Sequence, residues 1–352
     1  MKTFNLCLLG FGNVGRALAA LLVKKRGELR AGYGIDWRVT GVATRRLGRL
    51  VAPEGFADAE LAGGAVSPRA SPPPAGVPGW LRAARADVLF ETTSLEPLTG
   101  EPAVSHARAG LEAGAHVVTA NKGTIVHAYR ELSELARERG RRFMFEATVA
   151  DCPVFSLFRG SLPAARLLAF AGVVNSTTNV ILEEIEAGGT FDDGVRRAQQ
   201  LGIAETDPSH DVDGWDAAVK VCAVANVLMR ARLGPGDVRR EGIRGLSAGE
   251  VRAARDEGRP YRLVARARRD AGGRVEATVG PERLGPAGPF ASVAGTTLAV
   301  HFELDVLPGL TVVAHRPDLQ STAYGLLADF VNAVKNGTAG GGGRASNNLF
   351  VD

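Results

Sequence analysis

A glycine turn near the start of the chain constrains its fold more than any other feature. The apolar residues 4–9 predict a strand, residues 14–29 predict a helix, and the sequence GFGNVG joins them. Gly10, Gly12 and Gly15 fit the G-x-G-x-x-G fingerprint, which allows a tight turn, a close phosphate and a helix packed on a strand. The predicted cofactor-binding residues of this turn are Gly10, Phe11, Gly12, Asn13, Val14 and Gly15. The alternative is a glycine-rich turn that binds no ligand.

The first half of the chain continues as strands that alternate with helices. Strands are predicted at residues 38–44, 87–92, 116–120 and 143–148, and helices at 102–113 and 128–139. This alternation is typical of an α/β Rossmann-type fold, a doubly wound parallel sheet that binds ligands at the carboxyl ends of its strands. The residues at such ends include Thr92, Thr93, Lys122 and Glu146. We therefore expect Thr92, Thr93 and Lys122 to lie beside the cofactor.

The end of the strand at 38–44 bears on the choice of cofactor. Sites that prefer NAD usually place an acidic residue there, to bind the ribose hydroxyls. This chain has Thr44, Arg45 and Arg46 instead. Two guanidinium groups can bind a 2′-phosphate, so Arg45 predicts NADP, with NAD as the alternative. Solvation of both arginines is the other interpretation.

Composition excludes several classes of protein. A chain of 352 residues predicts two domains, and a net charge of +4 without a basic run interleaved with aromatic residues argues against nucleic-acid binding. No apolar run of about 18 residues is present, so no membrane span is expected. The three cysteines are far apart and odd in number, and the N-terminus lacks the pattern of a signal peptide. These features predict a cytoplasmic protein without disulfides.

The second half of the chain has a different pattern of predicted secondary structure. Residues 162–186 and 191–202 predict a strand and helices, and residues 259–313 contain alternating runs typical of antiparallel strands. The second domain is therefore expected to be α+β. The predicted organisation is a dinucleotide-binding domain at 1–150, to which 315–352 returns through a helix at 321–335, and a catalytic and dimerisation domain at 151–314. Residues 67–79 are predicted to be a proline-rich loop and the tail after 335 to be flexible.

An acidic stretch lies in the middle of the second domain. Residues 205–220, ETDPSHDVDGWDAAVK, begin as a loop and continue into an alanine-rich, apolar helix. Asp216 and Lys220 are four positions apart and share one face of that helix. A buried charge is costly unless it is paired or used. The stretch is therefore either a candidate site or an acidic surface loop followed by one helical ion pair.

These motifs together resemble homoserine dehydrogenase, in the short form without a regulatory domain. The likeness rests on GFGNVG at 10–15, on residues 99–123, 145–153, 172–191 and 201–220, and it covers most of the chain. The resemblance implies the interconversion of L-homoserine and L-aspartate 4-semialdehyde, a step of threonine and methionine biosynthesis, with NAD(P)H. It also implies a small-molecule substrate and a homodimer.

The resemblance also implies roles for particular residues. Lys220 and Asp216 would lie at the reacting carbon, with Lys122 as a second lysine beside the substrate. Substrate-binding residues would be Glu205, Asp211, Thr177 and Thr178. Glu146, Val149 and, in this chain, Asp151 would bind a monovalent cation such as Na⁺. A lysine can transfer the proton if partial burial lowers its pKa from about 10.4.

Three segments depart from the family's pattern. Ala-Asp-Cys between Val149 and Pro153 is shorter than the family's glycine-containing loop, and Ile203 stands where many relatives have tyrosine. Residues 314–322 replace a glycine-alanine-glycine turn beside the cofactor. These departures keep two alternatives open: a dehydrogenase of a related amino alcohol, and a cofactor-binding paralogue without activity.

Overall fold

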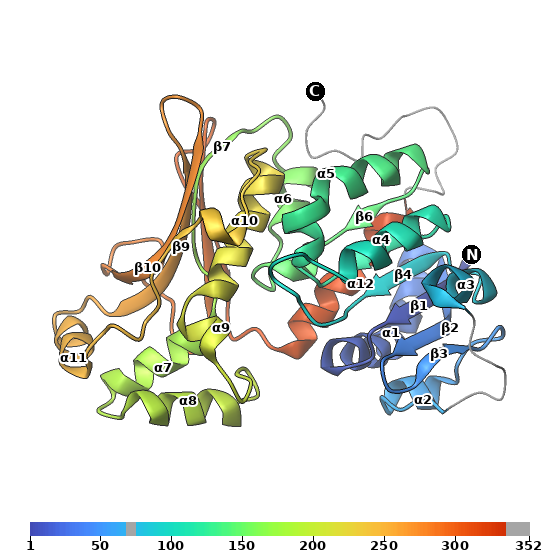
Figure 1. Ribbon diagram of the computed structural model, residues 1–352, viewed down its shortest axis with the longest axis horizontal. Coiled ribbons are helices and arrows are strands. Elements are labelled where there is room, and N and C mark those ends of the chain that lie inside the picture. Colours follow the sequence, from blue (N-terminus) through green and yellow to red (C-terminus); the bar gives the residue numbers. More distant parts are fainter. Residues whose placement is uncertain (68–74, 336–352) are drawn as a thin grey trace. The chain divides into compact units, whose positions relative to one another are not determined.

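The computed structural model describes residues 1–67 and 75–335, which form two compact units (Figure 1). Unit 1 comprises Met1–Thr148 and the segment from Asp318 onwards, and unit 2 comprises Val149–Pro317. The tail after 335 and most of the proline-rich loop at 67–79 lie outside the described residues. Within the described part of the loop, helix α3 already begins at Gly76, so the predicted loop is too long.

Unit 1 contains the predicted parallel sheet, in the order β3-β2-β1-β4-β5-β6. Strands β1, β2, β4, β5 and β6 pair in parallel, and only β3 is antiparallel, because it follows β2 as a hairpin. The strands are β1 Lys2–Leu9, β2 Ile35–Thr44, β3 Gly48–Val51, β4 Val88–Glu91, β5 His116–Thr119 and β6 Phe143–Met144. The helices are α1 Asn13–Tyr33, α2 Asp58–Ala62, α3 Gly76–Ala83, α4 Ala103–Glu112, α5 Gly123–Glu138, the 3₁₀ helix η1 Glu146–Thr148 and α12 Leu319–Lys335.

Helix α12 completes the core of unit 1, although it lies at the other end of the sequence. It packs beside α1 (Figure 1), and its Phe330 meets Phe4 and Phe90 edge to face, with ring centroids 6.0 Å apart in both pairs. Its Asp329 accepts a hydrogen bond of 2.6 Å from the backbone N–H of Glu146. The chain turns into η1 at this point, so the strand predicted at 143–148 ends at Met144.

Unit 2 is an α+β unit built on a second six-stranded sheet, ordered β12-β11-β7-β9-β10-β8. All neighbours in it are antiparallel except β10 and β8. Its strands are β7 Leu167–Val173, β8 Arg239–Arg240, β9 Tyr261–Arg269, β10 Val275–Arg283, β11 Leu298–Leu304 and β12 Leu310–Ala314. Its helices are α6 Phe155–Gly160, α7 Ser176–Glu186, α8 Phe191–Gln200, α9 Ser209–Val212, α10 Trp215–Leu228, α11 Ala248–Asp256 and the 3₁₀ helix η2 Pro235–Asp237.

Two helices of unit 2 are fixed against this sheet by different means. The alanine-rich α10 is almost wholly buried and packs on β9 and β10 through small side chains. Helix α7 is tied to β9 by Arg262, which is 4% exposed and pairs with Glu186 at 2.7 Å and with Glu183 at 3.1 Å. Removing one partner of such a buried pair is costly, so α7 has a fixed place on the sheet.

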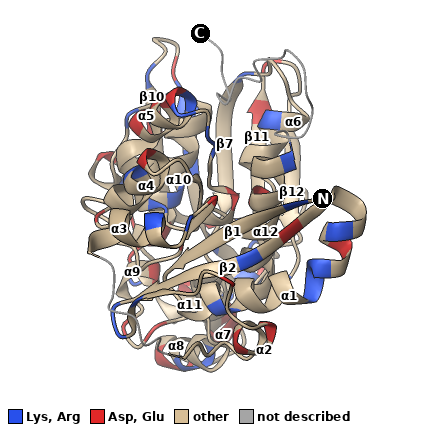
Figure 2. Cartoon of the chain, turned by 90° about the vertical axis from the view of Figure 1, so that its right-hand side faces the viewer, with Lys and Arg blue, Asp and Glu red and all other residues tan. Residues whose placement is uncertain are grey.

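Charges are mixed over both units. The chain has 42 Lys and Arg against 38 Asp and Glu, and in the view of Figure 2 both signs are interspersed along the visible elements. None of the helices within 1–67 and 75–335 has the length and apolar character needed to span a bilayer.

Candidate active site

The glycine turn of unit 1 joins β1 to α1 and leaves no room for side chains at two of its three glycines. Gly10 has φ of +97°, and a Cβ there would lie 2.5 Å from the carbonyl oxygen of Thr92. A Cβ at Gly15 would lie 2.4 Å from the carbonyl oxygen of Gly10. Only glycine fits at these two positions.

Gly12 differs from the other two glycines because a Cβ there would meet no heavy atom within 4 Å. It is exposed and forms the N-cap of α1, with no side chain capping the helix and no acidic residue in the first turn. Free N–H groups at a helix N-terminus attract phosphate. Beside this open turn, Phe11 is buried and Val14 packs on the core, so the backbone of the turn is fixed. The turn therefore fits the pyrophosphate of a dinucleotide.

Thr92 and Thr93, at the end of β4, use their hydroxyl groups within the protein. Thr92 Oγ1 donates to the carbonyl of Gly10 at 2.9 Å and so holds the glycine turn. The Thr93 hydroxyl donates to Glu91, a fully buried carboxylate that also accepts from Thr119 Oγ1 at 3.2 Å. The two threonines shape the strand end.

The loop after β5 carries Lys122 at the N-cap of α5. Asn121, buried beside it, donates to the carbonyls of Thr93 at 3.1 Å and Ser94 at 3.2 Å, and its Oδ1 accepts from the N–H of Gly123 at 2.9 Å. One amide thus ties together the loops that follow β4 and β5. Lys122 is half-buried in this braced loop.

Arg45 and Arg46 lie in the tight turn between β2 and β3. The turn is closed by Thr44 Oγ1, which accepts a hydrogen bond of 2.8 Å from the N–H of Leu47. Both arginines are exposed at the carboxyl end of β2. No acidic residue stands at this strand end.

In unit 2 the acidic stretch and its helix form a polar cluster around Lys220. Lys220 Nζ pairs with Asp216 at 2.8 Å and donates to the carbonyl of Val174 at 2.5 Å. Asn175 Nδ2 donates to Asp211 at 2.6 Å and to Asp216 at 3.0 Å. The structure therefore brings Asp211, Asp216 and Lys220 together. The side chain of Lys220 is 14% exposed and that of Asp216 is 17% exposed.

The pKa of Lys220 is raised, so the condition that partial burial lowers the pKa of the lysine is not met here. Burial does favour the neutral amine, but the charge and hydrogen bond of Asp216 outweigh that effect. The charges of Asp151 and Asp211 act in the same direction. Lys220 is therefore a protonated ammonium group at neutral pH.

Asn175 is a site residue that the sequence analysis missed. It ends the segment after β7 and caps α7, its Oδ1 accepting from the N–H of Thr178 at 2.9 Å while its Nδ2 holds the two aspartates. An asparagine before a helix is a recognisable N-cap. Its second role depends on residues 36 and 41 positions away, which no local pattern reveals.

The family resemblance predicts Thr177, Thr178 and Glu205 as substrate-binding residues, but their hydrogen bonds are made with groups other than the charged side chains of the Lys220 cluster. The hydroxyl of Thr177 donates to the carbonyl of Ile203 at 2.9 Å, and that of Thr178 to the carbonyl of Asn175 at 3.1 Å. Both threonines are buried, so they stabilise the start of α7. Glu205 is exposed, and only its backbone carbonyl is held, by Gln199 Nε2 at 3.1 Å.

The residues predicted to bind a cation occupy different units. Glu146 is buried in unit 1, whereas Val149 and Asp151 belong to unit 2. Within 1–67 and 75–335, no three His, Cys, Asp or Glu side chains gather as metal ligands would. A monovalent cation bound by backbone carbonyls needs no such group, so this site stays a prediction.

Two of the departures from the family's pattern have a shared backbone feature. Asp151 and Arg316 both have φ of +50°, in the left-handed region that favours glycine. The segment at 314–322 thus keeps a glycine-like turn at Arg316, between β12 and α12. At the third departure, Ile203 contributes its carbonyl to the start of α7.

Family models match nearly the whole chain. The model described as homoserine dehydrogenase matches residues 153–331, and the model described as homoserine dehydrogenase, NAD binding domain, matches residues 10–146. The second match begins at the first glycine of the turn in unit 1, and the first contains the whole Lys220 cluster.

Individual relatives agree with the family models. An NAD(+)-dependent homoserine dehydrogenase of Pseudomonas canavaninivorans is 36% identical over 348 residues, covering 96% of this chain and 98% of the relative. The structure of a homoserine dehydrogenase from Thiobacillus denitrificans has a TM-score of 0.80 at 29% identity, over 96% of this chain and 74% of that one. A hyperthermophilic archaeal homoserine dehydrogenase mutant in complex with NADPH has a TM-score of 0.78 at 27% identity, over 95% of this chain and 98% of that one. The chain therefore belongs to the homoserine dehydrogenase family, whose members are oxidoreductases that act on a CH–OH group with a nicotinamide cofactor.

Proposed function

We propose that this protein interconverts L-homoserine and L-aspartate 4-semialdehyde, and that the Lys220 cluster is where the substrate binds. The observation that carries the proposal is the group formed by Lys220, Asp216, Asn175 and Asp211 in unit 2. The nicotinamide, when bound, supplies or accepts the hydride. The protein has to hold the substrate and move one proton.

The charges of the cluster suit an amino acid substrate. Three carboxylates, those of Asp151, Asp211 and Asp216, act on the single ammonium group of Lys220. A substrate ammonium group would offset this excess of negative charge. We assign that contact to Asp211, with Glu205 as an outer partner, and we assign Thr177 and Thr178 to shaping the start of α7.

Lys220 would move the proton, with Asp216 orienting the reacting oxygen. As a protonated group, Lys220 can donate to the carbonyl oxygen when semialdehyde is reduced. In the reverse direction it must first lose its proton, which its raised pKa disfavours at neutral pH. The site is therefore better prepared for reduction. Lys122 would be the second lysine, and it takes the catalytic role if Lys220 proves structural.

Unit 1 would hold the cofactor at its glycine turn, with NADP preferred over NAD. The support is the exposed pair Arg45 and Arg46 and the absence of an acid at the end of β2. The relatives include one described as NAD(+)-dependent and one bound to NADPH, so they leave the preference open.

We infer three further properties from the family resemblance and the sequence. The protein would be a homodimer, formed through unit 2. A monovalent cation such as Na⁺ would bind near Glu146 and Val149. The three separated cysteines, of which Cys7 and Cys222 are buried, fit a cytoplasmic location.

One assay tests the function and the cofactor together. Oxidation of NADPH and of NADH would be followed with aspartate semialdehyde, and the reverse reaction with L-homoserine beside related amino alcohols. We expect turnover of semialdehyde and homoserine, and lower KM for NADPH than for NADH. Better turnover of another amino alcohol would overturn the substrate assignment. Cofactor binding without turnover of any of them would indicate a non-catalytic paralogue.

A further inference from the structure

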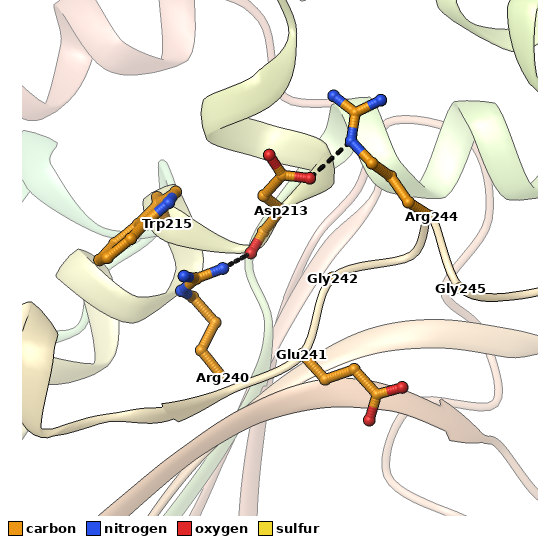
Figure 3. A pocket seen from close by; sticks show the side chains of 7 residues that line it. All are labelled: Asp213, Trp215, Arg240, Glu241, Gly242, Arg244 and Gly245. Carbon is orange, nitrogen blue, oxygen red and sulfur yellow. Dashed lines mark hydrogen bonds and ion pairs between the residues drawn. The ribbon is translucent and has the colours of Figure 1, made fainter.

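One acid in the acidic stretch points away from the Lys220 cluster. Asp213 lies between Asp211 and Asp216 in the sequence, yet its carboxylate pairs with Arg244 and its backbone carbonyl accepts from Arg240, the last residue of β8 (Figure 3). The carboxylates of the acidic stretch therefore have two different sets of partners. The carboxylates of Asp211 and Asp216 accept from Asn175, and the carboxylate of Asp213 accepts from Arg244.

The two arginines hold Asp213 at both its carboxylate and its backbone. Arg244 Nε donates to Asp213 Oδ1 at 2.6 Å, and Arg244 Nη2 donates to Ser209 Oγ at 3.2 Å. Arg240 donates to the backbone carbonyl of Asp213, and its guanidinium lies 3.7 Å from the ring centroid of Trp215. We call Arg240 and Arg244 the arginine clamp.

The backbone of the clamp segment is pressed against the acidic stretch. Ile243 N–H donates to the carbonyl of Val212 at 2.8 Å, and a Cβ at Gly242 would lie 2.3 Å from that same oxygen. Gly214, with φ of +78°, is the turn into α10, and Arg240 Cγ lies 3.3 Å from the position of its absent Cβ. The clamp therefore spans the turn at which the loop becomes the helix.

A small pocket of about 300 Å³ lies between the clamp and this turn, but its charges argue against an anion site. Its lining carries two guanidinium groups, from the clamp, and two carboxylates, from Asp213 and Glu241. The positive charge is thus balanced, and both arginines already donate to Asp213. The two arginines of the pocket lining instead bind Asp213, which belongs to the same acidic stretch as the proposed substrate-binding residue Asp211.

We propose that Arg240 and Arg244 are positioning residues, which place Asp211 for substrate binding by holding Asp213 and the turn at Gly214. The proposal rests on the function proposed above. Asp216 sits on α10, which the sheet holds in place, whereas Asp211 sits on α9, a helix of four residues. Loss of the clamp should therefore displace Asp211 more than Asp216, and weaken substrate binding more than turnover.

A positioning role of the clamp and a purely stabilising role predict effects of different size on kinetics and on stability. Arg244 and Asp213 are 50% and 36% exposed, and an exposed ion pair contributes little to stability because solvent screens it. A misplacement of about 1 Å in a binding group can cost on the order of 100-fold in rate. The clamp should therefore matter far more to kinetics than to melting temperature.

The test compares Asp213→Asn, Arg244→Ala, the double variant and Arg244→Lys. We expect the KM for homoserine to rise about tenfold in both single variants, with kcat changed less than about threefold and the KM for the cofactor unchanged. The double variant should be about as impaired as Arg244→Ala, because Asp213→Asn weakens a contact that Arg244→Ala already removes. Arg244→Lys should recover most of the loss. Arg252→Ala, an exposed arginine on α11, is the matched control and should behave as wild type.

A second readout does not depend on activity. Amide hydrogen exchange at residues 209–216 should be faster in Asp213→Asn and Arg244→Ala than in the wild type, while exchange in β9 stays the same. Unchanged exchange together with unchanged KM, or effects that add in the double variant, would overturn the clamp. If the wild type did not turn over homoserine, the proposed function would fail, and faster exchange would still support the clamp.

Discussion

The glycine turn of unit 1 and the Lys220 cluster of unit 2 are built on opposite principles. At the turn, Gly10 and Gly15 matter because no side chain fits there, and the site consists of backbone groups. At the cluster, side chains from three separate segments converge, and each satisfies another. The first kind of site is specified by a few adjacent residues. The second exists only after the whole unit has folded.

The Glu91 carboxylate of unit 1 and the Asp216 carboxylate of unit 2 have different partners. Glu91 in unit 1 is fully buried, and the donors around it are hydroxyl groups, one backbone N–H and His106 at 3.4 Å. Asp216 in unit 2 is paired with a lysine. A carboxylate held mainly by hydroxyl groups and a backbone N–H fixes geometry, whereas a carboxylate beside an ammonium group can share in a proton transfer. The comparison predicts that substitutions in unit 2 affect turnover and those in unit 1 affect cofactor binding.

Lys220→Met gives the largest expected effect. The variant keeps most of the aliphatic stem but removes the charge, and kcat should fall by roughly 10²–10⁴-fold with cofactor affinity unchanged. Asp216→Asn should act in the same way. Turnover, cofactor titration and melting temperature would be measured for each. Near-normal turnover with a lowered melting temperature would mean that the pair is structural and that Lys122 is the catalytic lysine.

The pH dependence of homoserine oxidation should reveal the raised pKa of Lys220. Because the base form must be generated, kcat for oxidation should rise by about tenfold per pH unit below that pKa. Reduction of semialdehyde uses the protonated form, so its rate should instead fall as pH rises through the pKa. Rates in both directions over the alkaline range would check this. A pH-independent oxidation rate would argue against Lys220 as the base.

Removing Arg45 and Arg46 together should abolish most of the preference for NADPH. A charge-assisted contact to a 2′-phosphate contributes about 1–3 kcal/mol, and NADH has no such phosphate. Dissociation constants of both cofactors would be measured for the wild type and for the double alanine variant. Equal affinities in the wild type would refute the assignment.

Gly12 and Gly15 offer a comparison within the turn itself. Gly12→Ala places its methyl group in open space, so the protein should stay as stable while cofactor binding weakens by about tenfold, or 1.4 kcal/mol. Gly15→Ala forces a contact at 2.4 Å and should destabilise unit 1 by about 1–3 kcal/mol. Thermal unfolding and cofactor titration distinguish the two effects. If the turn binds no ligand, Gly12→Ala should change neither the thermal unfolding nor the cofactor titration.

Glu205→Gln should have the smallest effect. The carboxylate is exposed, so its contact with a substrate ammonium group is screened, and KM for homoserine should rise about two- to fivefold. Steady-state kinetics would show kcat nearly constant. A collapse of kcat at constant KM would give Glu205 a part in the proton transfer instead.

The sequence predicted what depends on neighbours in the chain. The glycine turn, the alternation of strands and helices, and the residues at the ends of β2, β4 and β5 were predictable, because each follows from local sterics and periodicity. The family resemblance pointed to Asp211, Asp216 and Lys220, which the structure brings together. The antiparallel β3 was not predicted, since four residues carry little periodic signal.

What could not be predicted depends on contacts between distant segments. The early end of β6 goes with a hydrogen bond to Asp329, and the role of Asn175 depends on two aspartates from another loop. The direction in which the pKa of Lys220 moves could not be predicted either. Burial can be estimated from an apolar helix, but the convergence of three carboxylates on one amine cannot.

The place of α12 has a consequence for how this protein is made. Because Phe330 closes the core around Phe4 and Phe90, strands β1 and β4 lack part of their packing until residue 330 has been synthesised. Unit 2, whose residues are contiguous, can complete its core during translation. A released chain truncated before residue 319 should therefore contain a protease-resistant unit 2 and a protease-sensitive first strand, β1.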